Sequence, residues 1–229
     1  LLTAEEVQAK WSELNFSSRY KNVSRTYFTQ KVPFGANYVD KGIDITHDND
    51  AQGEHGSHVA GIAAANSYIP DGEGFVPALD SVMVQGVAPD AQFLIMKVFG
   101  KNGGAYDADY MVAIEDAILL DADVINLSLG SANAGASTDA TYQDILDGLA
   151  DSDTVVSISA GNAGSWADNT YLGYLYSDGC YFDTVGSPGS FTNAFTVASA
   201  DNDGATGGYL IVGDGSGFYH LGASVKFDV

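Results

Sequence analysis

The chain has 229 residues, of which 45% are hydrophobic, and this is enough for one domain with a substantial buried core. Nine basic and 30 acidic residues give a formal net charge of −21, which argues against nucleic acid or an anionic membrane as a partner, because both attract basic surfaces. The single cysteine, Cys180, excludes an intrachain disulfide, and no apolar run reaches the length of a membrane span.

The N-terminal part predicts a short amphipathic helix over residues 3–14, because Thr3 and Glu6 have the spacing of a capping box. The apolar face of this helix is formed by Leu2, Val7, Trp11 and Leu14. An extended aromatic segment at 31–40 and an acidic loop at 44–50 follow.

The segment 55–61, His-Gly-Ser-His-Val-Ala-Gly, begins a run of small apolar residues that ends at Asn66. Such a run predicts a helix that packs closely under a sheet, because Ala and Gly let backbones approach. A histidine in the first turn is held rigidly, and histidine as a residue type suits general-base work at neutral pH, so His55 is a candidate general base. The pair His55 and His58 could instead indicate a metal site, although no H-E-x-x-H pattern or thiolate cluster supports one.

After an expected loop at 67–86, strand patterns alternate with helix patterns. The strands are predicted at 92–99, 124–129, 154–158 and 194–198, and the helices at 105–120 and 139–150. This alternation predicts an α/β fold with a parallel sheet flanked by helices. From residue 201 glycine clusters separate short β-like pieces, which indicates the start of a second, β-rich domain.

Two motifs end predicted strands, where ligands of open parallel sheets bind. Small residues at 128–130 offer a backbone edge with which an extended peptide can pair. At 159–162, the amide of Asn162 could donate to a developing oxyanion, although an Asn after Gly is more often a turn residue. The candidate substrate-binding residues are Ser128, Leu129, Gly130, Ala160 and Gly161.

In this order, the motifs resemble those of subtilisin-like serine proteases, the subtilases. Residues 55–61 resemble the His-Gly-Thr-His-Val-Ala-Gly signature, with Ser57 in place of Thr, and 114–130 resemble the substrate-binding segment. Ala160-Gly-Asn162 resembles the segment of the oxyanion-hole asparagine. The resemblance covers about residues 31–200 and extends to the lactocepin and C5a-peptidase type of cell-envelope proteinase.

The resemblance implies peptide-bond hydrolysis through a Ser-His-Asp triad, with His55 as the base, Asn162 as the oxyanion donor and His58 as a structural residue pointing into the core. It implies that residues 1–200 are part of a catalytic domain and that 201–229 begin an inserted, protease-associated domain. Protein or peptide substrates, no required cofactor, and an extracellular, secreted or cell-wall location in a Gram-positive-type bacterium are expected. The resemblance allows a structural calcium ion, but the sequence offers no readable site for it.

The serine and aspartate of the triad have no match. No Gly-Thr-Ser-Met-Ala motif occurs, and Ser190 and Ser216 are expected to be loop serines. Asp40 lies fifteen residues before His55 without an apolar strand ahead of it, so we interpret it as unrelated to the triad. We expect both chain ends to be cuts in a longer protein, and residues 1–229 alone to be inactive. A non-catalytic surface protein that keeps the scaffold for binding is the alternative, and a metal-dependent hydrolase a more distant one.

Overall fold

The structure is a computed structural model that describes residues 1–20, 26–48, 50–51, 53–82, 84–130, 140–162, 185–200, 209–212 and 215–218. It divides into two units, Leu1–Val197 and Ala198–Val229, and each is described by itself. Cys180 lies outside the described residues. Within the described ranges, no helix combines the length and the apolar character needed to cross a membrane.

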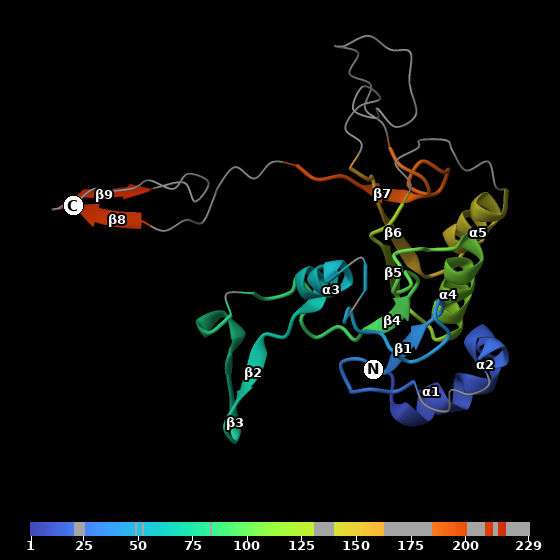
Figure 1. Cartoon of the computed structure of the whole chain (residues 1–229), viewed down its shortest axis with the longest axis horizontal. Coiled ribbons are helices and arrows are strands. Elements are labelled where there is room, and N and C mark those ends of the chain that lie inside the picture. The colour runs from blue at the N-terminus through green and yellow to red at the C-terminus, as the bar shows by residue number, and fades with distance from the viewer. Residues whose placement is uncertain are drawn as a thin grey trace, which may run out of the picture. The chain divides into compact units, whose positions relative to one another are not determined.

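The first unit contains two parallel sheets (Figure 1). In one, β1 (Phe34–Asn37) pairs with β4 (Leu94–Lys97), and in the other β6 (Val155–Ser159) lies between β5 (Val124–Leu127) and β7 (Phe195–Val197). Every pairing among these strands is parallel, which confirms the predicted α/β fold.

The two crossover helices are α4 (Asp107–Leu119), between β4 and β5, and α5 (Ala140–Ala150), between β5 and β6. Figure 1 shows them beside β5 and β6, and their apolar residues share one buried cluster with these strands. The cluster contains Tyr110, Ile114, Ala117, Ile125, Leu127, Leu146, Leu149, Val156 and Ile158. Residues three or four apart on each helix supply the helical members, as the helical spacing predicted.

The N-terminal segment folds into α1 (Ala4–Lys10), a 3₁₀ turn (Trp11–Glu13) and α2 (Asn15–Arg19). The capping box is confirmed, because the Glu6 backbone N–H donates to Thr3 Oγ1 at 3.3 Å and the Thr3 N–H donates to Glu6 Oε2 at 2.8 Å. The helix ends at Lys10, earlier than predicted, and the chain continues as the tighter turn.

A buried carboxylate joins this segment to the sheet. Asp116 of α4 has no exposed surface, and its oxygens accept the N–H groups of Asn15 and Phe16 at 2.7 and 2.9 Å. Asp116 thereby caps the first turn of α2, whose N–H groups have no partner within the helix. It also accepts the Tyr38 hydroxyl at 2.9 Å. Burial and then the charge of Asp116 raise the pKa of Tyr38, which keeps this hydroxyl protonated as a donor.

Two expectations about the middle of the chain are wrong. The stretch 67–86 is not only a loop, because β2 (Tyr68–Asp71) and β3 (Gly74–Pro77) form an antiparallel hairpin followed by a 3₁₀ turn, Ala78–Asp80. The second wrong expectation is that the helix starting at His55 packs closely under a sheet. The helix α3 (His55–Ala64) begins at the predicted residue, but Ala64 is its only buried residue. Small residues such as those of α3 allow another element to pack closely, but they do not determine which element does so.

In the second unit, β8 (Tyr209–Val212) and β9 (Gly215–Phe218) form an antiparallel hairpin. Ser216 lies in β9, so the expectation that it is a loop serine is wrong. The assignment of 201–229 to an inserted domain stays a prediction.

Candidate active site

The two predicted strand-end motifs lie side by side. Because Leu127 of β5 pairs with Ile158 of β6 in parallel register, the residues that follow each strand leave the same edge of the sheet. Ser159 Oγ donates to the Leu129 carbonyl oxygen at 3.2 Å and links the two motifs directly. The structure therefore brings Ser128–Gly130 and Ala160–Asn162 to one place, on two adjacent strands.

A later segment of the chain packs against both motifs. The Gly186 N–H donates to the Ala160 carbonyl oxygen at 2.8 Å, and the Ser187 carbonyl oxygen lies against Gly130. A Cβ atom added at Gly130 would come within 2.7 Å of that oxygen, so only glycine fits at this position. Gly161 has φ +89°, a backbone conformation that glycine adopts without strain.

Asn162 follows this glycine directly and is exposed at the end of β6. The pairing of β6 with β7 ends at Ser159, so Gly161, with its positive φ, and Asn162 both lie beyond the ladder. An exposed amide on a rigid strand end is suited to donate to a bound ligand.

The candidate base, His55, is the first residue of α3 and is exposed. The other end of α3 is held by the segment 86–88, in which the Val87 N–H donates to the Ile62 carbonyl oxygen at 3.1 Å. His58 is exposed as well, so the expectation that it points into the core is wrong in this structure. Between the described residues no hydrogen bond links His55 to the two strand ends.

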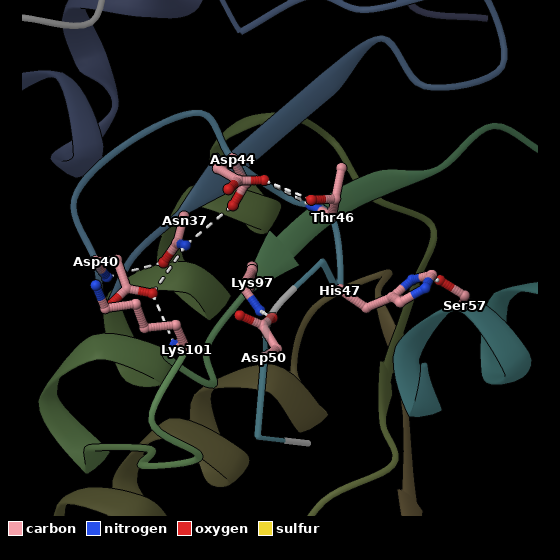
Figure 2. Close-up of polar contacts among 9 residues, drawn as sticks. All are labelled: Asn37, Asp40, Asp44, Thr46, His47, Asp50, Ser57, Lys97 and Lys101. Atoms are coloured by element: carbon pink, nitrogen blue, oxygen red, sulfur yellow. Dashed lines mark hydrogen bonds and ion pairs between the residues drawn. The ribbon is translucent and has the colours of Figure 1, made fainter. Parts of the chain in front are cut away.

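The loop that leads into α3 is held by polar contacts (Figure 2). The Asp50 carboxylate pairs with the Lys97 ammonium group at the carboxyl end of β4, and these side chains are only 6% and 14% exposed. His47 Nδ1 lies 3.2 Å from Ser57 Oγ in the first turn of α3. The pKa of Asp44 is lowered by the hydrogen bonds that it accepts from the Thr46 hydroxyl and N–H. None of these contacts was predicted from the sequence.

Asp40 is part of the turn that follows β1. Its Oδ2 accepts the Lys101 N–H at 3.0 Å and the Asn37 amide at 3.2 Å, and its own N–H donates to Asn37 Oδ1. The expectation that no apolar strand precedes it is wrong, because β1 is buried throughout. Its contacts nevertheless give its carboxylate a structural role in closing the turn.

We expect Lys97→Met to lower the free energy of unfolding by about 3 kcal/mol, because it leaves the Asp50 carboxylate buried without its partner. Urea unfolding of the chain measures this difference. Lys101→Met is the matched control, since the Lys101 side chain is exposed and only its backbone N–H contacts Asp40. Equal midpoints for Lys97→Met and the unmodified chain would contradict a stabilising role for the pair.

Comparison with known proteins places the chain in a family. The model of the subtilase family, peptidase family S8, matches residues 10–224. The PIII-type proteinase of Lactococcus lactis subsp. cremoris is 38% identical over 200 residues, which is 83% of this chain and 10% of that protein. The PII-type proteinase of Lacticaseibacillus paracasei is 37% identical over 198 residues, 82% of this chain and 10% of that protein.

A C5a peptidase of Streptococcus pyogenes serotype M6 is 33% identical over 174 residues, which is 72% of this chain and 14% of that protein. The chain thus spans about a tenth of the length of the lactococcal proteinases that it matches. The match to the family model over nearly all of the chain, with its parallel sheets and crossover helices, means that this chain belongs to the subtilase family.

Proposed function

We propose that the chain is part of a serine endopeptidase that hydrolyses peptide bonds in proteins or peptides through an acyl-enzyme. The observation that supports this most is the joining of Leu129 and Ser159 at the ends of two adjacent parallel strands. This contact supports the proposal because it joins Ser128–Gly130, the proposed peptide-pairing edge, to the segment that leads to Asn162, the proposed oxyanion donor. The names of the relatives, which include a proteinase and a C5a peptidase, agree with this chemistry.

In the proposed reaction, His55 takes the proton of a serine hydroxyl as that oxygen attacks the peptide carbonyl carbon. The Asn162 amide donates to the carbonyl oxygen as it becomes negatively charged. His55 then gives the proton to the leaving amine, and the C–N bond breaks. A water molecule next attacks the ester carbon of the acyl-enzyme while His55 takes its proton, and His55 returns a proton to the serine oxygen as the C–O bond to serine breaks. The edge formed by Ser128, Leu129 and Gly130 pairs with the substrate backbone. We propose that the serine and the orienting aspartate of the triad lie outside residues 1–229.

No cofactor is needed for this chemistry. A structural calcium ion is compatible with the proposed function, but we assign no residues to it. The acidic composition, with a net charge of −21, favours substrates with cationic segments. We place the protein outside the cell, secreted or attached to the cell wall, as the composition without disulfides permits.

Two assays on the full-length protein test the function. We expect cleavage of an unstructured peptide and covalent labelling by a serine-directed fluorophosphonate, with the label blocking cleavage. A protein that binds the peptide but neither cleaves it nor takes the label would instead be the non-catalytic scaffold protein. Cleavage lost on chelation and insensitive to the label would favour a metal-dependent hydrolase.

Asn162→Ala in the full-length protein is expected to lower kcat by about 10²–10³ and to leave KM nearly unchanged, because the amide meets a charge that exists only in the transition state. Steady-state kinetics on a peptide measure both constants. The exposed Asn66, which follows α3, provides the control variant Asn66→Ala. A wild-type kcat in Asn162→Ala would reduce Asn162 to a turn residue.

A further inference from the structure

Two side chains of α5 hold a distant loop by three hydrogen bonds, and a fourth hydrogen bond joins the two side chains to each other. The Gln143 amide pairs with the backbone of Thr192, donating from Nε2 to the carbonyl oxygen at 3.0 Å and accepting the N–H on Oε1 at 3.2 Å. Asp147 Oδ1 accepts Gln143 Nε2 at 2.6 Å and Asn193 Nδ2 at 2.8 Å. Asn193 sits at φ +64°, so these contacts fix a backbone conformation that most residues disfavour.

The loop held in this way is the segment 186–193, here called the bracing segment, and its other end contacts both strand-end motifs. Gly186 donates to the Ala160 carbonyl oxygen, and the Ser187 carbonyl oxygen lies against Gly130. At Gly189, an added Cβ would lie 3.0 Å from the Ser159 carbonyl oxygen. One segment therefore contacts the peptide-pairing edge and the Asn162 turn together.

The bracing segment is internally tied, so a displacement at one end reaches the other. The Ser190 N–H donates to the Gly186 carbonyl oxygen at 3.0 Å, and the Phe191 N–H donates to the Pro188 carbonyl oxygen at 3.1 Å. The Phe191 side chain packs against the buried cluster beneath α5. Consecutive turns anchored by a partly buried ring that packs on the core move as a unit more readily than they deform.

We propose that Gln143 and Asp147 are positioning residues. They set the distance between the peptide-pairing edge, Ser128–Gly130, and the turn at Ala160–Asn162. Neither side chain is proposed to touch the substrate, and both act through the bracing segment. The inference rests on the proposed function, because the two strand ends are the parts of the site that it orients. The Ser187 carbonyl oxygen packs tightly against Gly130, so a small shift of the bracing segment is expected to displace Gly130 as well.

The effect on catalysis is expected to exceed the effect on folding. The four hydrogen bonds are exposed, so their loss leaves the core of α5 in place. A displacement of about 1 Å at a reacting geometry can cost about 10²-fold in rate. For Gln143→Ala and Asp147→Ala we expect kcat/KM to fall about tenfold or more, mainly through a higher KM for extended peptides.

The test combines amide hydrogen exchange with kinetics on the full-length protein. Gln143→Ala and Asp147→Ala should speed exchange of the Gly186 N–H at least tenfold and raise KM. Asp147→Asn, which keeps an acceptor oxygen for Asn193, should restore both values. Asp144→Ala is the matched control, because Asp144 is an exposed acidic residue on the same helix.

Unchanged exchange at Gly186 in both alanine variants would overturn the proposal, and so would faster exchange with wild-type KM and kcat. A KM in Asp147→Asn as high as in Asp147→Ala would also overturn it. If the wild-type protein shows no turnover, the proposed function fails, and with it a role for these residues in catalysis. Failure of the positioning role alone is recognised by active wild-type protein with unaffected variants.

Discussion

His55→Ala in the full-length protein is expected to lower kcat by a factor of about 10⁶, because members of a triad act as a unit and little remains when the base is lost. The fold should stand, since His55 is exposed in the first turn of α3 and alanine favours a helix. Active-site titration with a fluorophosphonate and circular dichroism separate the two effects. The variant should fold normally and react with the label far more slowly.

The control for this prediction lies one turn further along the same helix. His58 is exposed, as His55 is, so His58→Ala should keep its activity and change the free energy of unfolding by no more than about 0.5 kcal/mol. If His58→Ala were folded and inactive while His55→Ala stayed active, the two roles would be reversed. An active His55→Ala enzyme would remove the assignment of the base altogether.

The parts of the site that could be predicted from sequence are those set by local patterns. Each strand end was recognisable because a short apolar run stops at small residues, as at Gly130 and Gly161. Their adjacency followed from the order of parallel strands joined by helices, and β5 and β6 are indeed neighbours. A sequence pattern of about ten residues was therefore enough to predict each strand end.

Two of the contacts that were not predicted join residues far apart in sequence. Asp50 and Lys97 are 47 positions apart, Gln143 and Thr192 are 49 apart, and nothing near either residue marks its partner. The hairpin of β2 and β3 did have a local signal, two short runs around the turn at Gly72, but Pro70 and the glycines favoured a loop. Proline is compatible with a hairpin strand whose N–H is not needed for pairing.

The largest expected effect on stability is at Asp116. We expect Asp116→Ala to lower the free energy of unfolding by about 3–4 kcal/mol, because three donors lose their acceptor at once. These are the N–H groups of Asn15 and Phe16 and the Tyr38 hydroxyl, and the first two also lose the cap of α2. Such a loss is a large share of the 5–15 kcal/mol typical of folded domains.

Urea unfolding of the chain tests this prediction, with Glu115→Ala as the matched control. Glu115 is the exposed neighbour of Asp116, and within the described part of the chain it accepts only the Asn15 side-chain amide, at 3.1 Å, so its loss should cost less than about 0.5 kcal/mol. Asp116→Asn should destabilise nearly as much as alanine, because its NH₂ group would face one of the donors that the carboxylate now accepts. If Asp116→Ala unfolded at the same urea concentration as Glu115→Ala, the buried carboxylate would not be what holds the N-terminal helices to α4 and β1.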